Sequence, residues 1–209
     1  HLLLIYRNHW LTVNYDLEQI QKDLKQRLSE HRFQHTQSVA ETAIRFAQAH
    51  NLTEAEITKI EIAAWLHDAC KELKNEELLE LAEFYQIEIY PEDEAHPNIL
   101  HARVGAAWIE EEYEILDPQI SHAVRDHTLG STEMYDSSKI LFLADMLEPL
   151  RGNNPELDRL REIVLSGQSL DQALLEAMNS KIKYVLGKNQ PLHPLSIEAR
   201  NALISSMIK

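Results

Sequence analysis

Apolar residues recur along most of the chain at spacings of three and four residues, the period of an amphipathic α-helix. Capping residues, prolines and glycines separate these runs, and no stretch shows the strict alternation of a half-buried strand. The pattern predicts helices over residues 16–29, 32–49, 53–68, 76–85, 99–113, 117–126, 137–147, 155–166, 169–186 and 196–208. The sequence therefore predicts an all-α fold.

Local signals mark where several of these helices begin. Thr53 with Glu56, and Ser169 with Gln172, have the spacing of a capping box. The stretch 86–98, which contains prolines and acidic residues, is predicted to be a surface loop. No repeat, low-complexity tract or linker interrupts the chain, so residues 16–209 are expected to form one helical bundle after an N-terminal extension over 1–15.

The composition limits the partners and the compartment. The 209 residues carry a formal net charge of −14, which argues against a nucleic-acid binder because such proteins need a basic face. A small anionic substrate stays compatible with this charge, since metal ions and local cations can reverse the field inside a cleft. Cys70 is the only cysteine, so no intrachain disulfide forms and a reducing compartment is expected. The apolar run over residues 2–5 is too short for a membrane span and lacks signal-peptide features, so we expect a cytoplasmic protein without a membrane partner.

The most informative local feature is the adjacent pair His67-Asp68 at the end of the apolar run 60–66. An imidazole and a carboxylate in a buried helix need partners, and a metal ion satisfies both. Lys71 follows His67 by four residues, so on a continuing helix it projects from the same face and places a positive charge beside the metal. Taken alone, the pair also fits two polar residues at an exposed helix end.

Other residues of ligand type lie within or beside apolar helical runs, namely His35, His101, His127 and Asp145. Joined to His67-Asp68, the residues His35 and Asp145 complete a four-ligand metal site drawn from three helices. His101 and His127 would then serve a second metal ion, with Asp68 as the bridge. Imidazole and carboxylate ligands suit iron, manganese, cobalt or zinc, and the absence of cysteine ligands argues against a structural zinc site.

A two-metal centre of this kind suits phosphoryl chemistry. It activates water and clamps the attacking and leaving oxygens of an in-line displacement. Lys71 and Arg151 are the cations expected to neutralise charge on the phosphates, and the guanidinium of Arg151 can do so as a two-point fork.

The ordered set of motifs resembles the HD-domain metal-dependent phosphohydrolases, and more narrowly the YqeK-like family of symmetrical bis(5′-nucleosyl)-tetraphosphatases. The resemblance spans residues 17–209. One mild departure is Ala102, where family members often have glycine. The matching pieces are Arg32-x-x-His35, His67-Asp68-x-x-Lys71, Leu100-His101, His127-Thr128-x-Gly130, Ala144-Asp145-x-x-Glu148-Pro149-x-Arg151 and Pro191-Leu192-His193-Pro194.

The resemblance implies an all-helical HD domain with iron in the metal site, which hydrolyses diadenosine tetraphosphate into two ADP. It implies metal ligation by His35, His67, Asp68 and Asp145, and catalytic roles for Asp68, Lys71 and Arg151. It also casts His101 and His127 partly as substrate contacts, so whether they bind a second metal ion, the substrate or both stays open. The implied nucleotide-binding residues are His35, His67, Lys71, His101, His127, Thr128, Arg151, Lys188, Asn189, Gln190, Pro191, Leu192 and His193.

Two other functions remain as alternatives at this point. One is an HD-type nucleotidase acting on deoxynucleoside triphosphates or nucleoside monophosphates, and the other is a non-catalytic nucleotide-binding regulatory module. A cyclic-dinucleotide phosphodiesterase is disfavoured because the Gly-Tyr-Pro element of that branch is absent. The sequence leaves homodimer formation open.

Overall fold

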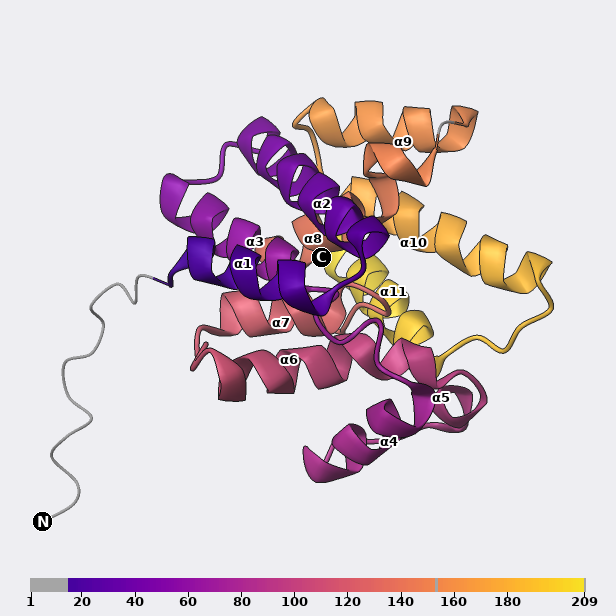
Figure 1. The fold of residues 1–209 in the computed structure, drawn as a ribbon. Helices are drawn as coiled ribbons and strands as arrows, with labels where there is room; N and C mark the ends of the chain where they lie inside the picture. Colours follow the sequence, from indigo (N-terminus) through magenta and orange to yellow (C-terminus); the bar gives the residue numbers. More distant parts are fainter. Residues whose placement is uncertain (1–14, 153, 209) are drawn as a thin grey trace, which may run out of the picture.

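The computed structural model describes residues 15–152 and 154–208, and within them the chain forms α-helices and two short 3-10 helices but no strand (Figure 1). This confirms the predicted all-α class; the expected N-terminal extension, except Tyr15, lies outside the described residues. The elements are α1 (Leu17–Arg27), α2 (Glu30–Ala49), α3 (Glu54–Leu66), α4 (Asn75–Phe84), α5 (Pro91–Ala95), η1 (Pro97–Leu100), α6 (His101–Glu112), α7 (Pro118–Asp126), α8 (Asp136–Leu147), η2 (Pro149–Arg151), α9 (Pro155–Leu165), α10 (Leu170–Gly187) and α11 (Pro194–Met207).

Two helices, α3 and α8, form the centre of the bundle. Helix α3 packs against α2, α7 and α8, and helix α8 packs in addition against α2, α7 and α10. Ile60 and Leu66 of α3 and Leu141 and Leu143 of α8 are fully buried, as expected for helices that are apolar on nearly every side. Because the chain leaves α3 at His67 and α8 carries Asp145, both central helices deliver polar residues into the interior. No helix of the described residues is long and apolar enough to cross a lipid bilayer.

One of the two predicted capping boxes is complete. Thr53 Oγ1 accepts from the Glu56 backbone nitrogen, and the Glu56 carboxylate accepts from the Thr53 backbone nitrogen, at 3.3 and 2.8 Å. The box at Ser169 is only half formed. Ser169 Oγ accepts from the Gln172 backbone nitrogen at 3.2 Å, whereas the Gln172 side chain donates forward to Glu176.

The predicted loop over 86–98 contains the short helix α5 and the start of η1, so this expectation is wrong in part. Pro91 occupies the first turn of α5, where its missing N–H costs nothing, and Asp93 Oδ2 accepts from the backbone nitrogen of Tyr90 at 2.9 Å. A second proline, Pro97, opens η1 in the same way, and the following α-helix begins at His101 rather than at Ile99.

The helix that carries His67 does not continue to Lys71. Helix α3 ends at Leu66, and the next residues form tight turns in which Lys71 N donates to Asp68 O at 3.0 Å. The expected helical stacking of Lys71 on His67 is therefore wrong. His67 and Asp68 are nevertheless buried, and the half-buried Lys71 places its Nζ 3.3 Å from His101 Nδ1.

Candidate metal and nucleotide site

Four predicted ligands meet at the centre of the fold. His35 comes from α2, His67 and Asp68 from the turns after α3, and Asp145 from α8. His35 Nε2 lies 3.1 Å from Asp145 Oδ1 and 3.6 Å from Asp68 Oδ2. His67 Nε2 lies 3.4 Å from Asp68 Oδ2 and 3.9 Å from Asp145 Oδ1. One ligand atom each from His35, His67 and Asp145 lies within 4.8 Å of the others, and the same holds for His67, Asp68 and His127. Both groups have the spacing of metal ligands.

The hydrogen bonds of these imidazoles show that the donor set fits a metal ion. His67 Nδ1 donates to the carbonyl of Ala64 at 2.6 Å, and a carbonyl only accepts, so the proton sits on Nδ1. His35 Nδ1 donates to Glu148 Oε1 at 2.9 Å. The opposite nitrogens, Nε2 of His35 and of His67, are buried and have no hydrogen-bond partner. Buried lone pairs held free in this way are what a bound metal ion would satisfy.

A second pair of imidazoles lies on the other side of Asp68. Asp68 Oδ1 lies 3.2 Å from His101 Nε2 and 3.7 Å from His127 Nε2. Both rings donate from Nδ1 to backbone carbonyls, at Asn98 and Val124, so their Nε2 atoms carry lone pairs. These two Nε2 atoms face each other at 3.1 Å, a contact between two acceptors that a cation or a water molecule would relieve. Asp68 thus turns one oxygen to each pair of histidines, as a bridging ligand does.

Burial and neighbouring charges favour the metal-binding forms of Asp68, Asp145, His101 and His127. The pKa of His67 moves the other way: burial acts to lower it, but Asp68 and Asp145 raise it. Although burial acts to raise it, the surrounding histidines hold the pKa of the Asp68 carboxyl well below its usual range. Burial likewise opposes the effect of His35, His67 and Arg151 on Asp145, whose pKa is also well below its usual range. Burial lowers the pKa of His127 to about 4 and lowers that of His101, so both imidazoles are neutral near pH 7.

The carboxylate of Glu148 binds the ring nitrogen of His35 that faces away from the cluster. Its carboxylate is 1% exposed and accepts from His35 Nδ1, from Ser38 Oγ at 2.7 Å and from the backbone nitrogen of Leu150 at 2.6 Å. Such an outer carboxylate fixes the tautomer and the orientation of a metal-binding imidazole.

Three cations reach the cluster. Arg32 Nη1 donates to Asp68 Oδ2 at 2.8 Å, and Arg151 donates to the Asp145 carboxylate at 2.6 Å and to the Asp145 carbonyl at 3.0 Å. Lys71 Nζ lies 3.3 Å from His101 Nδ1, a nitrogen whose proton is already donated to a carbonyl. The ammonium of Lys71 therefore stays available to a ligand.

The cluster opens into a cleft of about 470 Å³. His35 and His67 lie behind its wall, and Lys188 and Asn189, expected to bind nucleotide, are exposed outside it. The predicted site residues that do line the cleft are Asp68, Lys71, His101, His127, Thr128, Asp145, Arg151, Gln190, Pro191, Leu192 and His193. Wall residues that the sequence did not indicate include Phe142, Met178, Lys181, Ile182 and Val185.

His193 both lines the cleft and caps a helix. It is 4% exposed and lines the cleft, and its Nδ1 accepts from the backbone nitrogen of Leu195 at 3.2 Å, so it also caps α11. Its other ring nitrogen donates to Asp93 Oδ1 at 3.3 Å.

The HD domain family matches residues 32–150, more than half of the sequence. The chain belongs to the HD-domain family. A relative from Bacillus subtilis, named bis(5′-nucleosyl)-tetraphosphatase, symmetrical, is 34% identical over 182 residues, covering 87% of this chain and 94% of the relative. A relative of the same name from Halalkalibacterium halodurans is 35% identical, covering 87% and 93%. A crystal structure from Clostridium acetobutylicum, described as a predicted HD superfamily hydrolase involved in NAD metabolism, is 33% identical with a TM-score of 0.82, covering 90% and 97%.

Membership of this HD-domain family confirms the resemblance seen in the sequence and implies a divalent metal. The matched region contains the two groups of imidazoles and carboxylates that could hold one. It ends at residue 150, whereas the cleft is also lined by α10 and by residues 190–193. Part of the cleft wall is therefore built by helices that follow the HD domain.

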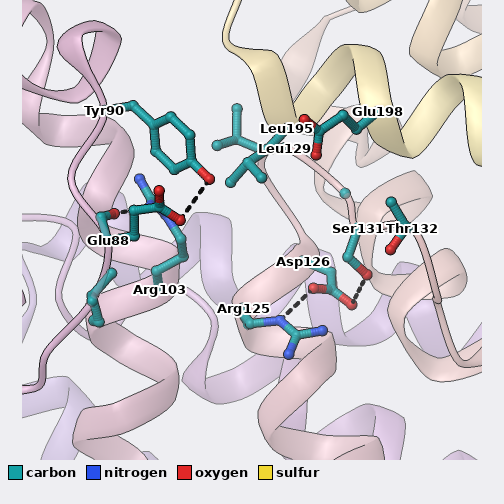
Figure 2. A pocket seen from close by; sticks show the side chains of 12 residues that line it. Glu88, Tyr90, Arg103, Arg125, Asp126, Leu129, Ser131, Thr132, Leu195 and Glu198 are labelled. Carbon is teal, nitrogen blue, oxygen red and sulfur yellow. Dashed lines mark hydrogen bonds and ion pairs between the residues drawn. The ribbon is translucent and has the colours of Figure 1, made fainter.

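Within the HD domain, the buried carboxylate of Asp126 holds the end of α7, where His127 lies. Asp126 is fully buried; its Oδ1 accepts from Arg125 Nε at 2.8 Å, and its Oδ2 accepts from Ser131 Oγ at 3.1 Å and from Ser138 Oγ at 3.0 Å. Figure 2 shows the Arg125 and Ser131 contacts beside a second cavity of about 270 Å³. This carboxylate fixes the end of α7 relative to the following segment and to α8, which positions His127.

Gly130 lies in the same segment, where little space is left for a side chain. Its φ is +75°, and a Cβ atom there would lie 2.8 Å from Met178 Cε and 3.0 Å from Ala199 Cβ. We expect Gly130→Ala to lower the free energy of unfolding by about 1–3 kcal/mol, from backbone strain and overpacking together. Denaturant unfolding measures this. The control is Gly187→Ala, where a Cβ meets nothing within 4 Å; equal stability of the two variants would contradict the close packing at Gly130.

Proposed function

We propose that this protein is a metal-dependent hydrolase that cleaves diadenosine tetraphosphate symmetrically into two ADP. The observation that carries the proposal is the pair of facing histidine groups joined by Asp68, opening into a cleft with cations at its wall. A metal centre beside cationic side chains suits a polyphosphate substrate. The names of the relatives from Bacillus subtilis and Halalkalibacterium halodurans supply the particular substrate and the symmetry of cleavage.

The donor set supports a divalent transition metal, for which we propose iron. His35, His67, Asp68 and Asp145 would hold one ion, and His101 and His127, together with Asp68, a second one. Manganese and cobalt fit the same neutral imidazole and carboxylate ligands. When bound, such ions polarise a phosphoryl oxygen and make a water molecule more acidic.

Side chains of this protein would bind the phosphates, orient a ligand and receive the base. Lys71 and Arg151, both in the cleft wall, would bind phosphate oxygens as they gain charge in the transition state. Glu148 keeps His35 in one orientation. Phe142, Met178 and Val185 give the cleft an apolar part that suits a nucleoside base, beside the polar residues 190–193.

Chromatography of the products tests this function. The metal-loaded protein is expected to convert diadenosine tetraphosphate into ADP alone, because one ADP moiety bound in the cleft would set the register of the phosphates on the metal site. Formation of ATP and AMP would contradict symmetrical cleavage. Deoxynucleoside triphosphates and nucleoside monophosphates, assayed in parallel, separate this activity from a nucleotidase, which would release phosphate or nucleoside from them.

A further inference from the structure

Helix α10 places one lysine in the wall of the cleft, outside the region matched by the HD domain family. Lys181 Nζ donates to the carbonyl of Thr128 at 2.5 Å and lies 4.7 Å from the centre of the Phe142 ring. Thr128 follows His127 directly, so Lys181 connects α10 with the segment that carries a candidate ligand. Lys183, two residues further along α10, is exposed and does not line the cleft.

The charges at the cleft wall are unequally paired. Four cations line it, two of which pair with the two carboxylates of the cluster: Arg32 with Asp68 and Arg151 with Asp145. Within the part of the chain that the structure describes, neither Lys71 nor Lys181 lies within ion-pair distance of a carboxylate. Two lysines thus line one cleft without a carboxylate at ion-pair distance, in a chain whose formal net charge is −14.

Burial and the neighbouring cations disfavour the positive charge of Lys181. Burial lowers the pKa of Lys181 to about 8, Asp145 acts in the opposite direction, and Arg151 and Lys71 lower it further. Near pH 7 most Lys181 side chains still carry the charge, although the surroundings disfavour it. Divalent ions at the cluster would add positive charge nearby, so an anionic ligand would relieve the repulsion.

We propose that Lys181 binds the phosphate chain of the nucleotide and is a specificity-determining residue for polyphosphate substrates. An ammonium group has three donors, of which Thr128 accepts one, so the others remain for phosphate oxygens. The same side chain would then hold the substrate and the segment after His127 together. The identity of the substrate rests on the proposed function, but the role of Lys181 applies to any nucleoside diphosphate that enters the cleft.

Calorimetric titration of the metal-loaded full chain with ADP and with inorganic tripolyphosphate tests the role of Lys181. We expect Lys181→Met to weaken the binding of both probes by about 10- to 100-fold, the usual effect of losing a charge-assisted hydrogen bond. Lys183→Met is the matched control on the same helix and should bind both as the wild type does. Metal content and the melting temperature, measured on each variant, check that the cluster and the fold are retained.

Two further variants separate direct phosphate binding from support of Thr128. Lys181→Gln keeps a donor for the Thr128 carbonyl without the charge, and Lys181→Arg keeps the charge. The proposal expects Lys181→Gln to lose affinity and Lys181→Arg to retain most of it, and this pair decides the question if Lys181→Met does not fold. Wild-type affinity in Lys181→Gln, or a loss for ADP without a loss for tripolyphosphate, would overturn it. If Lys181→Met and Lys181→Gln bind ADP weakly and the wild-type protein does not hydrolyse diadenosine tetraphosphate, the role of Lys181 is supported and the proposed function is refuted.

Discussion

Replacing Asp68 by alanine is expected to lower kcat for diadenosine tetraphosphate by at least about 10³-fold and to reduce metal content, the largest effect of any single substitution. Asp68 is the group that both pairs of histidines share, with one oxygen 3.4 Å from His67 and the other 3.2 Å from His101. Its loss also leaves Arg32 without its carboxylate partner beside these rings. Elemental analysis and a product assay measure the two consequences.

The matched control for this substitution is Asp158→Ala. The side chain of Asp158 is 53% exposed and lies in α9, so its removal should change neither metal content nor rate. Circular dichroism establishes that both variants are folded. A folded Asp68→Ala protein with the metal content of the wild type would refute the assignment of Asp68 as a bridging ligand.

The cluster around Asp68 could be predicted because each of its members stands in or beside an apolar run. A buried helix offers no water to an imidazole or a carboxylate, so such residues must find one another or a metal ion. His67 and Asp145 illustrate this, since the helices that deliver them, α3 and α8, are buried over more than half of their residues. The apolar runs predicted burial and the residue types predicted metal ligation, and both pointed to the cluster around Asp68.

The path of the chain around the site was harder to predict. Turns replace the helix between Leu66 and Lys71, and they depend on tertiary partners such as Arg27, whose Nε donates to the carbonyl of Ala69 at 2.8 Å. Helix α5 is held by Asp93, which pairs with Arg103 of α6. Contacts between residues distant in sequence leave no local pattern, so propensity alone could not reveal these elements.

The sequence contains one local signal for the part of the cleft wall formed by α10. Lys181 follows the buried Ala177 by four residues and therefore lies on the apolar face of the helix, where a lysine is unusual. Lys188 and Asn189 illustrate the opposite case. Helix α10 runs to Gly187, and Lys188 Nζ turns back over the Tyr184 ring at 5.6 Å, so only the later residues of that loop reach the cleft.

Arg151→Ala is expected to lower kcat by about 10²–10³-fold, the usual cost of removing one preorganised group that stabilises transition-state charge. The guanidinium lies in the cleft wall, is 44% exposed, and is held by the Asp145 carboxylate and carbonyl. A cation held in this way needs no reorganisation when charge develops on a phosphate. Arg151→Lys should recover only part of the rate, because an ammonium supplies charge without the two-point fork.

Two measurements distinguish this role from support of Asp145. If Arg151 acts on phosphate, Arg151→Ala keeps its metal content and melting temperature near those of the wild type while kcat falls. If its main function were to hold Asp145, metal content would fall together with the rate. Arg159→Ala is the control, since Arg159 is an exposed arginine in α9 that pairs with Glu176 outside the cleft. An unchanged kcat/KM in Arg151→Ala would refute the role of Arg151 in binding phosphate.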